Sequence, residues 1–552
     1  MEKRSMKFAF ILLAASILVS CAGQSNDSGM AGDQASVPPD GRGSVVMTTG
    51  VGIGDVMSDF TEEKWEDSVW LRAYRDELGI DMKAAWYAKG KEAITQKVSV
   101  AIASGKIPDL LAVNSEQLSA ISRTNLYTDL TSIYETYATP LTKSILNEDD
   151  KRSLASATFD GKLIAIPGLN SAIDGASFMW IRQDWLDKLG LKVPETASEL
   201  EEVMRSFENR DPDGNGKADT IGLVLSKDFL NQGLAEAIGL FNAFDAYPKI
   251  WVKDKGGNLA YGSVQPEVKD ALAFLSRLYK EGIIETDFAA MDTPTAAELA
   301  ANGRGGVVFG AMWNGMYPLQ GTKDRFKDSD WRAYPIVSKD EQPAHPQIKL
   351  NVEQYFVVRS GYEHPEALIK LINFWTELNY GDAGKERYDR FLGLPPAPGH
   401  HYAVAKVWKS NKNLQAYLDI KDALETGVLS KLNVEEKGYY DNILKYSAGD
   451  DSFAQYEKVF GRTGSYAVMN DYVQRDLFKM DEFYGASTEA MRSRLLTIDQ
   501  MISEYYTKVI MGTETIDQFD AFVANLGQIG LDEITKEVNV WKKTDSVMFS
   551  KE

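Results

Sequence analysis

The sequence predicts an α/β fold of two lobes, joined by hinge crossings and extended by helices at the carboxyl end. The clearest sign is the stretch 159–196. There a buried strand (163–166), a break at Pro167-Gly168, a second apolar strand (178–181) and a helical repeat follow one another. The second sign is the length of 552 residues, which suits two or three domains rather than one core. We therefore expect the chain to pass from one lobe to another at this bend, beside a cleft.

The composition is that of a strongly acidic globular protein. The formal net charge is -20, and residues 1–20 carry +2, so about -22 remains on the rest of the chain. A surface this acidic disfavours nucleic acid and anionic lipid as partners. The 11 Trp and 25 Tyr residues fit a protein that stacks aromatic rings on sugars, although the cores of a large protein explain most of them equally well.

The amino terminus has the pattern of a secretory signal. Lys3, Arg4 and Lys7 precede an apolar run at residues 8–19, which is shorter than the roughly 20 residues that a membrane span requires. We expect residues 1–20 to be a lipoprotein signal peptide. Residues 21–44, rich in Gly, Ser, Asp and Pro, are expected to form a flexible tether.

The sequence Leu18-Val19-Ser20-Cys21 contains the only cysteine of the chain and resembles the lipobox of bacterial lipoproteins. The resemblance implies that Cys21 carries acyl chains such as palmitate and forms the mature amino terminus. The protein would then be anchored in the lipid bilayer at the extracellular face of the cell membrane, as in a Gram-positive bacterium. Two or three acyl chains anchor a protein stably, whereas one is marginal. An ordinary signal peptide with an incidental cysteine is the alternative.

The segments around the bend resemble one protein family. DGKLIAIP at 160–167, IRQDWL at 181–186 and LGL at 189–191 are similar to the first hinge crossing and the next helix of the extracellular solute-binding proteins of bacterial ABC importers. The likeness is to the maltodextrin-binding relatives and the larger lipoprotein branch of family 1. Further similar segments follow in the same order, so the resemblance covers nearly all of the chain after the tether.

This resemblance implies a periplasmic-binding-protein-like, type II-like fold. Such a protein captures a carbohydrate, here an oligosaccharide, between its lobes and delivers it to the membrane permease subunits of an ABC importer. We expect a monomer. The implied first lobe comprises residues 45–166 and 305–378, and the implied second lobe comprises residues 167–304 and 379–552. The expected hinge residues are Ile166, Pro167, Gly168, Gly305 and Gly306.

The resemblance also places ligand contacts in loops beside the crossings. After the strand that ends at Val113, a loop holds Asn114, Glu116 and Gln117, where relatives bond sugar hydroxyls with polar side chains. A helix cap at Asn114 or Ser115 is the alternative interpretation.

An aromatic residue just past the second crossing often stacks on the ligand in this family, and Trp313 has this position. A Trp face matches the apolar side of a pyranose ring, and core packing is the alternative. Tyr355 is expected to face the cleft. Trp180 is a further candidate, although its place on an alternating strand suits the core as well.

The sequence DPDGNGKAD at 211–219 has the spacing of a calcium-binding loop. Oxygen donors stand at positions 1, 3, 5 and 9, with glycine at position 6 and a backbone carbonyl at position 7. The expected ligands of a structural Ca²⁺ are Asp211, Asp213, Asn215, Lys217 through its carbonyl, and Asp219. The loop 211–222 ends in Gly222 where a bidentate Glu belongs, which lowers the expected affinity. A turn without metal is the alternative.

Catalytic motifs are missing from the sequence. The chain has four His and no H-E-x-x-H or G-x-S-x-G pattern, and its one cysteine is the expected acylation site. We therefore expect no enzyme. Paired carboxylates for glycoside hydrolysis stay open, because 80 acidic residues produce near pairs in any fold. A surface-anchored polysaccharide hydrolase or lyase is the alternative function.

Overall fold

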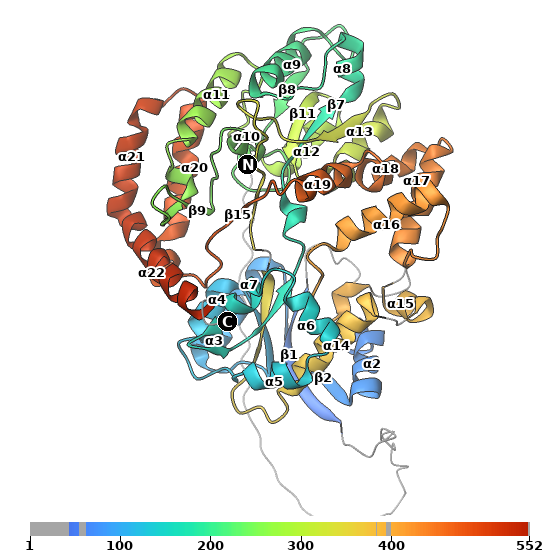
Figure 1. The fold of residues 1–552 in the computed structure, drawn as a ribbon, viewed down its shortest axis with the longest axis vertical. Helices are drawn as coiled ribbons and strands as arrows, with labels where there is room; N and C mark the ends of the chain where they lie inside the picture. Colours follow the sequence, from blue (N-terminus) through green and yellow to red (C-terminus); the bar gives the residue numbers. More distant parts are fainter. Residues whose placement is uncertain (1–43, 54–61, 351, 382–383, 393–398, 550–552) are drawn as a thin grey trace, which may run out of the picture. The chain divides into compact units, whose positions relative to one another are not determined.

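The computed structural model describes residues 44–53, 62–350, 352–381, 384–392 and 399–549. The expected signal peptide, the acylation site Cys21 and the tether up to residue 43 lie outside the described residues. A five-stranded and a four-stranded sheet organise the described chain (Figure 1). Among these residues no helix combines the length and the apolar character needed to cross a bilayer.

The first sheet has the strand order β2-β1-β3-β14-β6. β1 (Val45–Ile53) runs parallel to β2 (Ile80–Lys89) and β3 (Leu110–Val113). β14 (Val352–Val358) runs antiparallel between β3 and β6 (Ile166–Leu169). The strand between β3 and β6 thus comes from a part of the chain almost 200 residues further on.

One core fills the space between the first sheet and its helices. The helices that contribute to it are α1 (Glu62–Glu66), α2 (Val69–Leu78), α3 (Lys91–Ser104), α4 (Ser115–Ile121), α5 (Thr131–Tyr137), α6 (Pro140–Leu146), α7 (Arg152–Ser156), α14 (Glu366–Tyr380) and α15 (Lys385–Leu392). A short hairpin of β4 (Thr158–Phe159) and β5 (Lys162–Leu163) precedes β6.

The second sheet has the strand order β12-β7-β11-β8 and is covered on both faces. Its strands are β7 (Phe178–Arg182), β8 (Ile221–Val224), β11 (Gly305–Gly310) and β12 (Trp331–Tyr334). Met179 and Ile181 of β7 belong to one core, whereas Phe178 and Trp180 belong to another. Successive side chains of a strand point to opposite faces, so one apolar strand fills two cores.

Two groups of helices cover these faces. On one face lie α8 (Gln183–Leu189), α9 (Ala197–Asn209), α10 (Ile238–Ala243), α11 (Val268–Lys280), α20 (Leu496–Ile510), α21 (Phe519–Leu526) and α22 (Asp532–Phe549). On the other lie α12 (Thr293–Ala301), α13 (Leu319–Arg325), α16 (Lys412–Thr426), α17 (Val434–Ser447), α18 (Ala454–Phe460) and α19 (Ser465–Gln474). Figure 1 shows the carboxyl-terminal α20, in red, beside α11. Two small pairs complete the fold: β9 (Trp251–Lys253) with β10 (Leu259–Tyr261), and β13 (Gln347–Ile348) with β15 (Lys479–Met480).

Strand pairing moves the predicted lobe boundaries. β6 belongs to the first sheet, so the chain leaves that sheet after Leu169 rather than at residue 166. The prediction that residue 305 begins a return to the first lobe is wrong, because β11 pairs with β7 and β8. The prediction that the second lobe resumes at residue 379 is also wrong, because Ala405 and Val407 are buried in the first core.

Within the described residues, three short stretches, the connections, lead from one sheet and its helices to the other, at 170–177, 349–350 and 409–411. The first and third lie side by side. Ser171 Oγ donates a hydrogen bond to the carbonyl of Ser410 at 2.5 Å, and the amide of Trp408 donates to the carbonyl of Leu169 at 3.1 Å. The first and third connections are therefore held together by hydrogen bonds where the chain passes between the sheets.

The segment before α20 also contacts the first sheet's helices. Ser119 Oγ on α4 donates to the carbonyl of Ser487 at 2.9 Å, and Arg492 Nη1 donates to Ser119 Oγ at 2.6 Å. The segment before the carboxyl-terminal helices is thus tied to α4 by direct hydrogen bonds, whereas the helices themselves pack in a core of the second sheet.

Candidate functional site

The turn after β11 presents an exposed aromatic side chain. β11 ends at Gly310, and a short 3₁₀ turn, η3 (Met312–Gly315), follows. The carbonyl of Trp313 accepts hydrogen bonds from the amides of Met316 at 2.9 Å and Tyr317 at 3.1 Å, which closes the turn. The side chain of Trp313 remains 37% exposed, whereas its neighbours in the turn are buried. Trp313 is therefore available to a ligand.

This turn lies next to the connections between the sheets. The carbonyl of Gly233 accepts from Asn314 Nδ2 at 2.9 Å. The neighbouring Gln232 donates through Nε2 to the carbonyl of Gly175 at 3.2 Å and to that of Gln347 at 2.9 Å. Gln232 thereby links the loop that holds the Trp313 turn to Gly175 in the first connection and to β13, which precedes the second connection. The exposed indole of Trp313 therefore lies on a turn that is hydrogen-bonded, through Gln232 and Gly233, to segments next to the connections between the sheets.

The loop after β3 uses its polar side chains differently. Asn114 Oδ1 accepts from the amide of Gln117 at 2.8 Å, and Gln117 Oε1 accepts from the amide of Asn114 at 3.1 Å. This is a capping box at the start of α4. Gln117 Nε2 donates to the carbonyl of Thr95 and to Ser99 Oγ, and the side chain is buried. The prediction of Gln117 as a ligand contact is wrong, because its polar atoms are used internally. Glu116 remains exposed.

Two other predicted ligand residues lie in the cores. The hydroxyl of Tyr355 is 2.8 Å from Ser156 Oγ, and burial raises the pKa of Tyr355 to about 12. Trp180 is fully buried, and its Nε1 donates to the carbonyl of Ala311 at 3.3 Å. Both ligand predictions are wrong because the rings fill core space; for Trp180 the core alternative is confirmed.

The predicted hinge glycines serve packing. A Cβ on Gly305 would lie 2.3 Å from Val224 Cγ2, and one on Gly306 would lie 2.3 Å from Phe207 Cδ2. Both residues sit in the second sheet between β7 and β8, so the prediction that they form a hinge is wrong. Ile166, Pro167 and Gly168 are buried in β6, directly before the first connection.

The loop 211–219 has the tight geometry that its sequence predicts. The carboxylate of Asp211 accepts from the amides of Gly214 at 3.0 Å, Asn215 at 3.1 Å and Gly216 at 3.0 Å. Asn215 Nδ2 donates to Asp213 Oδ2 at 2.7 Å and to Asp219 Oδ1 at 3.1 Å. The carboxylates of Asp213 and Asp219 therefore meet at the side-chain amide of Asn215, while the carboxylate of Asp211 is held by backbone amides.

Charge within this loop is unbalanced. Burial raises the pKa of Asp213, and the carboxylates of Asp219 and Asp211 act in the same direction. A hydrogen bond from Asp213, together with the backbone amides, lowers the pKa of Asp211. Lys188 Nζ donates to the carbonyl of Pro212 at 2.6 Å and brings one positive charge to the loop.

Across the described residues, no group of three or more His, Cys, Asp or Glu converges closely enough to hold a metal ion.

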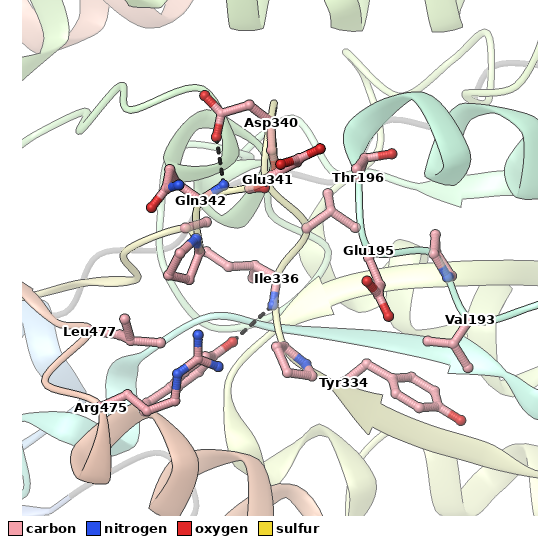
Figure 2. Close-up of a pocket in the computed structure, with 17 residues that line it drawn as sticks. Val193, Glu195, Thr196, Tyr334, Ile336, Asp340, Glu341, Gln342, Arg475 and Leu477 are labelled. Atoms are coloured by element: carbon pink, nitrogen blue, oxygen red, sulfur yellow. Dashed lines mark hydrogen bonds between the residues drawn. The ribbon is translucent and has the colours of Figure 1, made fainter.

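A pocket of about 550 Å³ lies elsewhere on the second sheet's side of the molecule (Figure 2). It is bounded by the loop before α9, the loop after β12 and the end of α19, where the hydroxyl of Tyr472 accepts from the amide of Ile336 at 2.8 Å. None of the predicted ligand residues lines it. It shares no residue with the Trp313 turn, so its size alone does not make it the ligand site.

Sequence reasoning missed the loop 231–236, which carries Gln232 and Gly233. The only signal was a polar and glycine-containing stretch after an apolar strand, which is typical of any loop.

Comparison with known proteins agrees with this arrangement. The model of the family described as bacterial extracellular solute-binding protein matches residues 77–377, more than half of the 552 residues. Among curated relatives, lipoprotein LipO of Bacillus subtilis is 28% identical over 249 residues, which cover 45% of this chain and 47% of LipO. The polygalacturonan/rhamnogalacturonan-binding protein YtcQ of the same organism is 30% identical over 220 residues, which cover 39% of this chain and 41% of YtcQ. The matches thus span about half the length of these relatives or less.

Solved structures share the fold across nearly the whole chain. The HMO binding ABC-transporter associated solute binding protein of Bifidobacterium longum infantis has a TM-score of 0.63 and 17% identity, over 91% of this chain and 99% of that one. An EF-hand mutant of the Streptococcus pneumoniae substrate binding protein FusA, in complex with fructo-nystose, has a TM-score of 0.59 and 15% identity, over 91% and 100%. The predicted two-lobed α/β fold of solute-binding proteins is confirmed.

Proposed function

Because the chain belongs to the family of bacterial extracellular solute-binding proteins, we propose that it captures an oligosaccharide between its two lobes and delivers it to the permease subunits of an ABC importer. The observation that carries the proposal is the exposed Trp313 beside the connections between the sheets. YtcQ is named as a polygalacturonan/rhamnogalacturonan-binding protein, and the FusA structure is a complex with fructo-nystose. Both relatives support a carbohydrate as the ligand.

An aromatic face at a sheet junction suits this role physically. The indole covers the apolar C–H face of a sugar ring, and amide and carboxylate groups around it satisfy the hydroxyls. Relative motion of the two sheets about the three connections would close the site over the ligand. The ligand shifts the balance between open and closed forms only by its greater affinity for the closed form.

A glycan panel tests the proposal. Purified protein is incubated with neutral and acidic oligosaccharides, binding is measured by calorimetry, and the sugar is recovered and sized. Intact bound sugar supports a receptor. Shortened products would instead establish the polysaccharide hydrolase or lyase, and a panel without any binder would remove the carbohydrate proposal.

We propose further that the protein is a monomer held at the extracellular face of the cell membrane by acyl chains on Cys21. The lipobox-like sequence Leu18-Val19-Ser20-Cys21 supports the anchor, and the name of the relative LipO agrees with it. Mass spectrometry of the amino-terminal peptide from membranes should find a diacylglyceryl cysteine. The same peptide from a Cys21→Ser variant should be unmodified, and an unmodified wild-type peptide would refute the anchor.

A structural Ca²⁺ at residues 211–219 is a second proposal. Asp211, Asp213, Asn215 and Asp219 would hold the ion through side-chain oxygens, and Lys217 through its carbonyl. The raised pKa of Asp213 beside two other carboxylates fits a site that gains from positive charge. The presence of an EF-hand in FusA, a protein of the same fold, supports the proposal.

The calcium proposal has a matched control in the chain. Asp254 Oδ1 accepts from the amides of Gly256 and Asn258, both at 2.8 Å, and so caps a similar turn without the other donors. Ca²⁺ at one hundred times its Kd should stabilise the wild type by about 2.7 kcal/mol. The Asp213→Asn variant should lose this gain and Asp254→Asn should keep it. If neither Ca²⁺ nor EDTA changes the melting temperature, the calcium proposal is refuted and residues 211–219 are a turn without metal.

A further inference from the structure

A short segment, residues 247–251, lies along one face of the β13–β15 pair. Gln347 Nε2 of β13 donates to the carbonyl of Pro248 at 2.8 Å. Directly after β15, the carboxylate of Asp481 accepts through Oδ1 from the amide of Trp251 at 3.0 Å. The segment is therefore fixed against the two strands near both of its ends.

Three lysines lie where this segment faces the strands. Lys249 belongs to the segment itself. Lys349 stands two residues after Gln347, and the ladder continues past β13 by one more hydrogen bond, so both side chains lie on the same face. Lys479 pairs with Gln347 in the parallel ladder, and its Nζ lies 5.4 Å from the ring centre of Tyr247. The three side chains thus share one face of a small structure.

These lysines have no carboxylate of their own. Across the described residues none of the three forms an ion pair, whereas the nearby Lys253 pairs with Glu482 at 2.9 Å. Asp481 uses its Oδ1 for two backbone amides, at 3.0 and 3.1 Å. Asp499, the other carboxylate that acts on this face, accepts from the hydroxyl of Tyr261 at 2.6 Å. The face therefore carries three cations and two carboxylates that are already engaged by other donors.

Lys349 lies at the second connection, where the chain passes between the sheets. The residue is exposed, yet the protein groups around its ammonium disfavour the charged form and lower its pKa. Exposure combined with desolvation is typical of a side chain in a concave surface. An anion that entered from solvent would stabilise this ammonium.

The loop before Ala235 joins this face to the Trp313 turn. Asn231 Oδ1 accepts from Lys249 Nζ at 2.8 Å. Two residues further on, the carbonyl of Gly233 holds the Trp313 turn, and a Cβ on Gly233 would lie 3.5 Å from Trp313 Cζ2. Two residues of chain span at most about 7 Å. The lysine and the indole are therefore within reach of one oligosaccharide.

We propose that the ligand is an acidic oligosaccharide: Lys249 and Lys349 bind the carboxylate of a uronic acid unit, while Trp313 stacks on a sugar ring of the same chain. The inference rests on the proposed function and adds the charge of the ligand. An ammonium has three donors, so Lys249 can bond a carboxylate and Asn231 together.

The net charge of -20 does not exclude such a ligand. Salt screens exposed charges that lie more than about 10 Å away, so the nearest groups decide. Unpaired lysines favour an anionic sugar over a neutral sugar of the same shape, because only the anion gives them a charged partner.

The test compares oligosaccharides that differ only in charge. Uronate trimers, trigalacturonate among them, and their carboxyl-reduced neutral counterparts are titrated into the full chain by calorimetry. At least one uronate trimer should bind about ten-fold more tightly than its reduced counterpart, and high salt should weaken its binding more.

The outcomes separate this inference from the proposed function. If neutral trimers bind as tightly as the uronates or more tightly, the inference is overturned and the oligosaccharide receptor stands. If no sugar binds, both are overturned. A sulfated trimer that binds where every uronate fails would overturn the assignment of a carboxylate.

Variants locate the charge contact. Lys349→Met should raise the Kd for the uronate trimer about ten-fold and leave the Kd for the reduced trimer unchanged, whereas Lys349→Arg should retain most of the affinity. Lys249→Met, on the other side of the face, should behave like Lys349→Met. Lys253→Met removes a nearby lysine that is already paired and is the matched control. An equal loss for both trimers in Lys349→Met, or the same loss in Lys253→Met, would overturn the proposal.

Discussion

Two turns follow strands of the two sheets, and they use polar and aromatic residues in opposite ways. After β3, the side chains of Asn114 and Gln117 accept hydrogen bonds from each other's backbone amides, and Gln117 also donates to α3. After β11, hydrogen bonds of the backbone and of the Asn314 side chain fix the turn, and the Trp313 side chain remains 37% exposed. The first turn starts a helix, whereas the second presents a side chain.

The difference shows that position beside a strand end does not make a ligand contact. A polar side chain that already satisfies a helix terminus would have to break that bond to reach a sugar, at a cost of about 1 kcal/mol. An aromatic ring whose turn is fixed by other groups has no such cost. Of the residues predicted as ligand contacts, Trp313 and Glu116 remain free to take that role.

The largest effect is expected from Trp313→Ala. Loss of an aromatic anchor should weaken oligosaccharide binding by about 2 kcal/mol, which is about thirty-fold in Kd. Calorimetry with the best ligand of the panel measures this, and Trp313→Phe should retain part of the affinity. Tyr137→Ala, which removes another exposed aromatic ring on α5, is the control and should bind normally. An unaltered Kd in Trp313→Ala would show that the turn after β11 does not present a ligand contact.

Asn114→Ala should have a smaller effect and on a different property. It removes the cap of α4, which costs about 1 kcal/mol of local stability, and it should leave ligand affinity unchanged. Amide hydrogen exchange in α4 measures the loss, and Asn114→Asp should restore protection because Asp caps equally well. If Asn114→Ala weakened binding and left exchange unaltered, the turn would be a ligand site after all.

Glu116→Ala should show the smallest effect. The side chain is exposed in the first turn of α4, so exchange there should change little. If Glu116 accepts one sugar hydroxyl, Kd should rise about three-fold, as for a single exposed hydrogen bond. A thirty-fold loss, equal to that of Trp313→Ala, would show that the two turns contribute alike.

Much of the fold was accessible from sequence because it depends on local patterns. Apolar runs marked β7 and β11, and the spacing of aspartates and glycines marked the loop at residues 211–219. The Pro167-Gly168 pair was expected to break a strand at 163–166, but it lies inside β6. The place of Trp313 just past an apolar strand was also predicted, and its ligand contact stays a prediction. Each of these features follows from a few consecutive residues.

The rest depends on contacts between distant residues. Nothing in the run Gly305-Gly306 distinguishes a hinge from a strand centre, and the choice is made by Val224 and Phe207 packing against it. Trp180 and Tyr355 alternate along strands whose two faces are both covered, so no exposed face existed for them. The role of Gly233 is visible only when its carbonyl meets Asn314, 81 residues away.

The place of β14 in the first sheet constrains how the protein can be made. β3 and β6 do not touch each other, and the strand between them is Val352–Val358. A nascent chain that has produced its first 170 residues therefore holds an incomplete sheet with two unpaired strand edges, a known hazard for aggregation. Protection during synthesis, by a chaperone or by delayed collapse, has to last until more than as many residues again as that first segment have emerged, because the missing strand ends at Val358.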